Sequence, residues 1–130
     1  KAMSEPYLNR PGSVDGPGPL SQLERAVLAV MLKGEGDDFS KLRAQLAQAT
    51  LASRTHSGVG FVSRLDVPDG IPTLAETASL RLRPVLAMHP HLTERAEFLL
   101  QVRAGRLAVL EAYCFEGSWP ADEAEFRVVG

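Results

Sequence analysis

The sequence predicts an α+β domain in which two N-terminal helices pack on a curled, mostly antiparallel sheet of four to six strands. Apolar residues recur at helical spacing between residues 20 and 49, and from residue 50 they alternate with a period of two. Glycine and proline turns separate the later segments, as expected for strands joined by hairpins. Helices followed by a run of strands indicate an α+β fold, for which we expect a cystatin-like or NTF2-like roll.

Length and composition are those of one globular domain. The chain has 130 residues, 45% of them apolar and 23% charged, with a formal net charge of −2. Residues 20–130 form the predicted domain, while residues 1–19, rich in proline and glycine, are expected to be a flexible arm. The arm is either a loose terminus or a segment that wraps a second subunit through Tyr7 and Leu8.

Two helices are predicted at the start of the domain. Ser21 and Glu24 have the spacing of a capping box, so a helix begins there and ends near Gly34. Asp37 or Asp38 is expected to cap a second helix, whose polar side, including Gln45, we interpret as solvated. A loop this short predicts an antiparallel helix pair.

Four segments after residue 50 have the features of strands. Residues 59–67 alternate between an apolar and a polar face, and residues 50–55 are an expected strand before them. Residues 79–88 alternate again, with Pro84 favouring an edge or a bulge. Residues 125–129 are short enough to pair at a sheet edge.

The stretch 95–120 predicts a β-hairpin around which the sheet is organised. A three-residue loop, Arg103–Gly105, needs a positive φ only at Gly105, whereas a two-residue loop would also impose it on Ala104. The three-residue loop places Glu97 opposite Glu111, with Tyr113 one step beyond. Two carboxylates in that position repel each other unless a cation, a shared proton or water relieves them.

This pair supplies the one candidate pocket in the sequence. Glu97, Glu111 and Tyr113 could line a polar pocket in which a carboxylate acts as acid or base. The alternative is a surface-facing or salt-bridged pair without catalytic function. The arginines available to either arrangement are Arg64, Arg81 and Arg83.

Other candidate sites are weaker. His89 and His91 are two residues apart, as in some metal sites, but Pro90 and the missing flanking motif favour exposed loop histidines and no metal. Cys114 is expected to be a buried structural thiol. Trp119 either plugs the end of the core or anchors a protein partner, and Tyr7 is a second candidate for partner binding. No motif implies a cofactor.

Several motifs resemble a family of small bacterial α+β proteins that has no established activity. They are Gly58–Phe61, the hairpin 98–107, and Leu110–Tyr113 followed by Trp119-Pro120. The similarity spans roughly residues 20 to 120, with Ala112 where the family has glycine. It supports the predicted fold and singles out Glu111 and Trp119, but it implies no reaction.

Function is constrained mainly by exclusion. One cysteine and no apolar leader favour a bacterial cytoplasmic protein, and the net charge of −2 favours neither nucleic acid nor membrane as a partner. We expect a homodimer, because an open sheet has edges and a face to protect. A protein-binding or regulatory, immunity-type module is the leading hypothesis, with no enzymatic activity. The alternative is a pocket protein or minor enzyme that binds a small polar ligand through Glu111, Tyr113 and an arginine.

Overall fold

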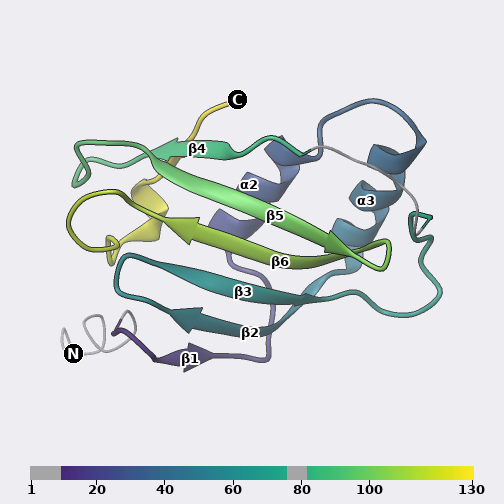
Figure 1. Cartoon of the computed structure of the whole chain (residues 1–130), viewed down its shortest axis with the longest axis horizontal. Coiled ribbons are helices and arrows are strands. Elements are labelled where there is room, and N and C mark those ends of the chain that lie inside the picture. The colour runs from purple at the N-terminus through teal and green to yellow at the C-terminus, as the bar shows by residue number, and fades with distance from the viewer. Residues whose placement is uncertain (1–9, 76–81) are drawn as a thin grey trace.

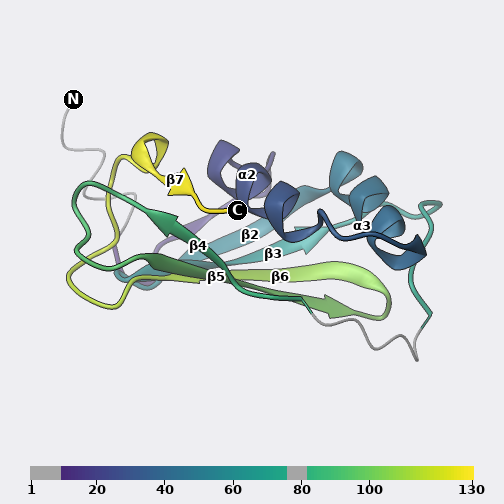
Figure 2. The ribbon, with the colours of Figure 1, turned by 90° about the horizontal axis from the view of Figure 1, so that it is seen from above.

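A computed structural model describes residues 10–75 and 82–130, which form one open antiparallel sheet with two α-helices on one of its faces. The strand order is β1-β2-β3-β6-β5-β4-β7. Figure 1 shows the sheet in front of the helices, and Figure 2 shows the two layers from above. The elements are β1 (Val14–Asp15), α2 (Gln22–Met31), α3 (Asp37–Gln48), β2 (Thr50–His56), β3 (Gly60–Asp66), β4 (Val85–Met88), β5 (Ala96–Arg103), β6 (Arg106–Tyr113), a 3-10 turn (Glu123–Glu125) and β7 (Arg127–Val128).

The predicted α+β class is confirmed, and the sheet is larger than expected. It has seven strands within the described residues where four to six were predicted, because β1 and β7, of two residues each, extend its edges. The cystatin-like or NTF2-like roll is not confirmed by this open sheet. Part of the predicted strand 79–88, including Arg81, lies outside the described residues, and β4 begins at Val85.

Helix α2 begins as the sequence predicts. The hydroxyl of Ser21 accepts from the backbone N–H of Glu24, and a carboxylate oxygen of Glu24 accepts from the backbone N–H of Ser21. Helix α3 differs from the prediction, since its N-cap is Gly36 and no side chain caps it. Asp37 and Asp38 instead lie in its first turn, where their negative charges interact favourably with the positive end of the helix dipole.

The hairpin of β5 and β6 has a two-residue turn, so the predicted three-residue loop is wrong. Ala104 and Gly105 have φ values of 51° and 74°, as in a type I′ turn. The register shifts between Gln101 and Val102, because Val102 pairs with Leu107 while Gln101 pairs with Val109. Ala108 is therefore the extra residue of a β-bulge.

This register separates the two glutamates that were predicted to face each other. Glu97 pairs with Tyr113, and Glu111 pairs with Leu99. Between residues 97–101 and 109–113 the observed pairing differs from the predicted one by two residues, which leaves Glu97, Glu111 and Tyr113 on their predicted face of the sheet. Glu97 and Glu111 are therefore diagonal neighbours on one face. Beyond the bulge the difference is one residue, and Leu107, which was predicted on the same face as the glutamates, lies in the core.

An aromatic cluster fills the core between the sheet and the C-terminal segment. The Trp119 ring lies 5.5 Å from the ring of Phe61, 6.0 Å from Phe98 and 5.0 Å from Phe126. Trp119 is 4% exposed, so it plugs the end of the core and does not present its indole to a partner. Cys114 is buried and free, as predicted.

Candidate functional site

The side of the sheet that faces away from α2 and α3 is the candidate functional site, and we call it the outer face. Side chains alternate across a strand, so the residues beside each core residue define this face. On β3, Phe61 and Ser63 are buried toward the helices. On β6, Leu110 and Ala112 are in the core. The outer face of the three central strands consists of Val62, Arg64, Val109, Glu111, Tyr113, Glu97, Leu99 and Gln101.

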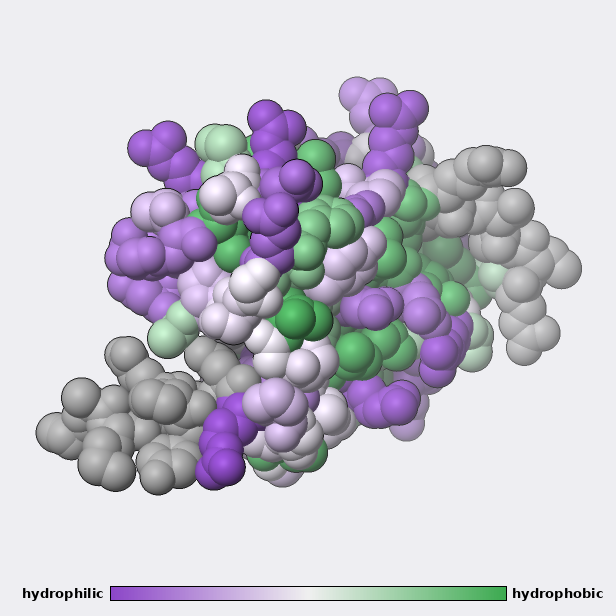
Figure 3. Space-filling view, turned by 60° about the vertical axis from the view of Figure 1, so that its left-hand side comes forward, coloured by the Kyte–Doolittle hydropathy of each residue, from purple (hydrophilic) through white to green (hydrophobic). Residues whose placement is uncertain are grey.

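The middle of the outer face is apolar. Val62, Glu111 and Leu99 lie side by side on β3, β6 and β5, and Val62 and Leu99 are half-buried. Val109 is only 6% exposed although it does not belong to the core cluster. Figure 3 shows hydrophobic side chains of the sheet interspersed with hydrophilic ones. The helices leave this apolar strip uncovered, and sheet faces of this kind normally contact another element.

One end of the outer face is acidic. The Tyr113 hydroxyl donates to Glu97 Oε1 over 2.9 Å, and Glu111 is the next outward residue of β6. The hydrogen bond to Glu97 raises the pKa of Tyr113, and burial and the nearby charges of both glutamates add to the shift. The Tyr113 ring packs edge-on against the exposed ring of Phe115, with 5.4 Å between their centroids.

The other end of the outer face is basic. Arg64, Arg103 and Arg106 line an open hollow of about 340 Å³ together with one carboxylate, Asp66, and an apolar wall that includes Val109. Arg106 donates to the carbonyl of Val67 at 3.2 Å and to the Asp69 carboxylate at 3.1 Å. Arg103 donates twice to the side-chain oxygen of Gln101. These bonds hold two of the three guanidinium groups at the hollow.

Two charges of the outer face have no partner in the described part of the chain. No hydrogen bond or ion pair joins Arg64 or Glu111 to another residue between 10 and 75 or 82 and 130. Arg64 pairs across the strands with Val109, and Glu111 pairs with Val62. Both charges therefore remain available to a group outside the chain.

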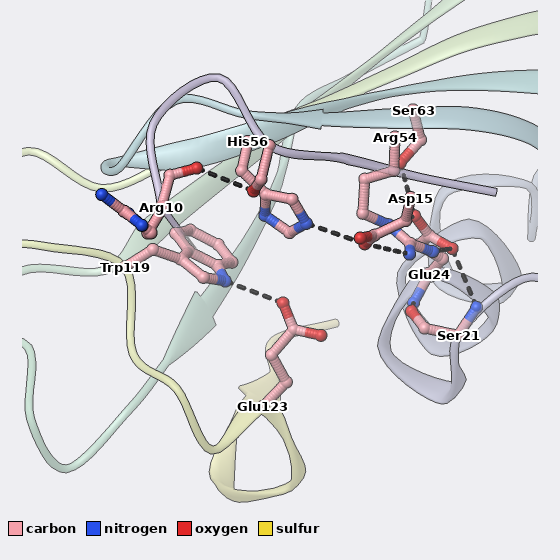
Figure 4. A network of polar contacts seen from close by, with 10 residues as sticks. Arg10, Asp15, Ser21, Glu24, Arg54, His56, Ser63, Trp119 and Glu123 are labelled. Atoms are coloured by element: carbon pink, nitrogen blue, oxygen red, sulfur yellow. Dashed lines mark hydrogen bonds and ion pairs between the residues drawn. The ribbon is translucent and has the colours of Figure 1, made fainter. Parts of the chain in front are cut away.

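A second polar cluster lies on the opposite, helix-covered side (Figure 4). Glu24 of α2 is completely buried and accepts from Arg54 of β2 and from the Ser63 hydroxyl of β3. Burial alone would raise the pKa of Glu24, but the bonds from Arg54, Ser63 and the Ser21 backbone outweigh it and lower the pKa. The cluster joins helix α2 to two strands.

The same cluster holds β1 against β2. Asp15 accepts from Arg54 over 3.1 Å and contacts His56 Nε2 at 2.7 Å. These contacts outweigh burial and lower the pKa of Asp15. His56 Nδ1 is buried without a hydrogen-bond partner. Among the described residues the cluster contains no group of three or more side chains that could hold a metal ion, and its bonds connect α2, β1, β2 and β3.

Glu123 lies beside this cluster and accepts from the Trp119 indole N–H at 2.8 Å (Figure 4). Burial raises the pKa of Glu123, partly offset by the indole bond. The carboxylate thus serves as the acceptor that a buried indole requires.

Among the described residues of the predicted pocket, only Arg64 lines the hollow at the basic end. Glu97 and Tyr113 are in contact and Glu111 is adjacent to them, whereas Arg64 lines the hollow at the opposite end. Arg83 is exposed in the segment before β4, and Arg81 and Tyr7 lie outside the described residues. Sequence reasoning did not place Arg103 and Arg106 at this site, although their position beside the hairpin turn was a signal for it.

His89 and His91, the weak candidates for metal binding, have contacts within the protein, and His89 is buried although it was expected to be exposed. His89 Nε2 lies 2.8 Å from the carbonyl of Asp122, and its Nδ1 accepts from the backbone N–H of His91 at 3.0 Å. Both ring nitrogens of His89 are therefore engaged. Residues 10–75 and 82–130 contain no group of three or more His, Cys, Asp or Glu side chains that could hold a metal ion.

Comparison of the chain with family models, curated proteins and solved structures finds no match. The resemblance of its motifs to a bacterial family therefore stays a prediction. Among the described residues, no helix is both long and apolar enough to span a membrane.

Proposed function

We propose that the chain is a cytoplasmic protein-binding module whose outer face docks on a protein surface of the inverse charge order. Such a partner places cationic groups over Glu97 and Glu111, an apolar side chain on the strip at Val62 and Leu99, and carboxylates at the arginine-lined hollow. The uncovered apolar strip between opposite charges is the observation that carries this proposal.

The distribution of charge supports a surface partner over a pocket enzyme. Glu111 and Tyr113 do not line the hollow at Arg64, so this hollow does not bring the acid and the phenol to the guanidinium. Arginine donates hydrogen bonds to a carboxylate through a planar fork of N–H groups. Three arginines around a shallow hollow can therefore bind more than one carboxylate. A flat face with charges at both ends selects a partner by orientation as well as by affinity.

An acidic peptide tests the arginine end of this face. We expect hexaglutamate, added to dilute isotope-labelled protein, to shift the NMR signals of the Arg64 and Arg103 guanidinium groups and of the β6 amides near them. The variant R64A/R103A removes two of the three donors and should weaken binding by about tenfold or more. Arg25, an exposed arginine on α2, supplies the matched control R25A.

Two outcomes would contradict the proposal. Shifts spread evenly over all exposed arginines would indicate a general charge effect without a docking face. Saturable binding of inorganic phosphate at the hollow, with no response to hexaglutamate, would assign the arginines to a small anion and thus to a ligand-binding pocket.

A further inference from the structure

The order of charges on the outer face makes this face complementary to itself. Along the strands, its outward residues form four successive rows: Tyr113 and Glu97, then Val62, Glu111 and Leu99, then Arg64, Val109 and Gln101, then Asp66, Arg106 and Arg103. The first two rows contain both glutamates, and the last two contain the three arginines and one carboxylate, Asp66. A half-turn that exchanges the two ends therefore places each acidic row over a basic one.

We propose that the occupant of the outer face is a second copy of this chain, related by a two-fold axis that crosses the strands between the second and third rows. This inference rests on the proposed function, since it names the partner of the same face. The axis lies in the plane of the interface and sets β5 over β5 and β6 over β6 with reversed direction. Sheets packed face to face lie about 10 Å apart with strands within about 30° of each other, so their side chains meet midway.

Specific pairs follow from this axis. Glu97 lies opposite Arg103 of the second copy, because both residues are on β5 and in exchanged rows. Glu111 on β6 comes beside Arg64 of the second copy on the neighbouring strand. Each of these pairs occurs twice in the dimer, as an isologous interface requires.

Three features of the single chain are explained by this arrangement. The unpartnered charges of Arg64 and Glu111 gain opposite charges. The half-buried Val62 and Leu99, next to the axis, are covered on both sides of Glu111 and form the apolar part of the interface centre. Tyr113 comes over Arg106 of the second copy, where a guanidinium can stack on its ring.

Charge exchange between two variants gives the sharpest test. We expect the wild-type chain to form dimers by sedimentation velocity and native mass spectrometry, and to dissociate as salt is raised. The variants E97R/E111R and R64E/R103E bring like charges together, so each should self-associate about a hundredfold more weakly. An equimolar mixture of the two should form a heterodimer, because every reversed charge then meets its opposite.

Control variants separate this surface from the rest of the molecule. R25E/E35R reverses two exposed charges, one on α2 and one in the loop between the helices, and should leave the dimer intact. Circular dichroism and thermal unfolding check that each variant is folded, and E97Q/E111Q with R64Q/R103Q provides a milder pair. The chain that carries all four reversals should dimerise with itself.

The results also distinguish this inference from the proposed function. A wild-type monomer at the highest soluble concentration that still binds hexaglutamate would overturn the second copy as occupant and leave the docking face in place. A dimer that both double reversals leave unchanged would place self-association on another surface. A wild-type chain that neither dimerises nor binds hexaglutamate would contradict both proposals.

Discussion

The side chain of Gln45 in helix α3 holds the turn of the β5–β6 hairpin by bonds to the backbone. Its amide oxygen accepts from the N–H of Leu107 at 2.9 Å, and its amide nitrogen donates to the carbonyls of Gly105 at 2.9 Å and Pro72 at 3.0 Å. Gln45 is fully buried, although its position on the polar side of α3 predicted a solvated side chain. The helix therefore positions the hairpin whose strands form the centre of the outer face.

Substitution of Gln45 by alanine tests this role. We expect Gln45→Ala to lower the free energy of unfolding by about 2–4 kcal/mol, because the N–H of Leu107 and the carbonyls of Gly105 and Pro72 lose the bonds that Gln45 makes to them. Gln48→Ala on the exposed side of the same helix is the control and should change stability little. Urea denaturation measures both. Equal effects of the two substitutions would show that the bonds of Gln45 add nothing to stability.

The sequence predicts the elements of the fold better than the contacts that connect them. Hydrophobic periodicity and the capping box of Ser21 and Glu24 are local signals, and the predicted helix start is confirmed. The hairpin turn was missed because Ala104 adopts a positive φ that its own residue type disfavours. Bonds from Gln45 and from Leu74, both distant in sequence, stabilise that turn.

In the candidate site, too, the features with local sequence signals were predicted and those that depend on long-range contacts were not. Alternation placed Glu97, Glu111 and Tyr113 on one face of the hairpin, and the two-residue shift in register left that face unchanged. The basic end could not be predicted in the same way, because Arg64 comes from β3 and reaches Arg103 and Arg106 only through strand order. Strand order depends on long-range pairing, which no local pattern encodes.

The two turn residues Ala104 and Gly105 should respond in opposite directions to substitution. Asparagine tolerates positive φ and precedes glycine in type I′ turns, so Ala104→Asn should raise the free energy of unfolding by about 0.5–1 kcal/mol. A Cβ at Gly105 would lie 2.2 Å from the carbonyl oxygen of Leu74, so Gly105→Ala should lower it by more than about 2 kcal/mol. Chemical denaturation of both variants decides this, and a destabilising Ala104→Asn would contradict the strain argument.

Stability should depend on pH through Glu24. Its folded-state pKa is lowered, so the stability that it contributes is complete above its unfolded pKa, near 4, and is lost as the pH falls through the folded value. At neutral pH, Glu24→Gln leaves Asp15 as the carboxylate partner of Arg54 among the described residues and should cost about 3–5 kcal/mol.

Denaturation of wild type and Glu24→Gln across the acid range measures this dependence. The difference between them should begin to shrink below pH ~4, where Glu24 becomes protonated in the unfolded chain, and should keep shrinking until the pH passes the lower folded value. Asp37→Asn breaks an exposed ion pair with Lys41 and should have no resolvable effect at any pH. A constant difference across the range would exclude ionised Glu24 as the source of the stability.

The phenol of Tyr113 reports directly on the acidic end of the outer face. The hydrogen bond to Glu97 raises the pKa of Tyr113, so its phenolate should form above the ordinary value of about 10. The chain has two tyrosines, so absorbance titration of a Tyr7→Phe background isolates Tyr113. In this background Glu97→Gln should lower the pKa of Tyr113, because the charged acceptor is lost. Glu111→Gln should lower the pKa of Tyr113 less, since Glu111 acts only through its charge.

The matched control is Glu116→Gln, because Glu116 bonds to Thr93 and not to Tyr113. The titration is made on dilute protein at raised salt, because the proposed dimer dissociates under these conditions and a second copy then does not cover the phenol. A pKa of Tyr113 that is unchanged by Glu97→Gln would show that the bond between these two side chains does not persist in solution.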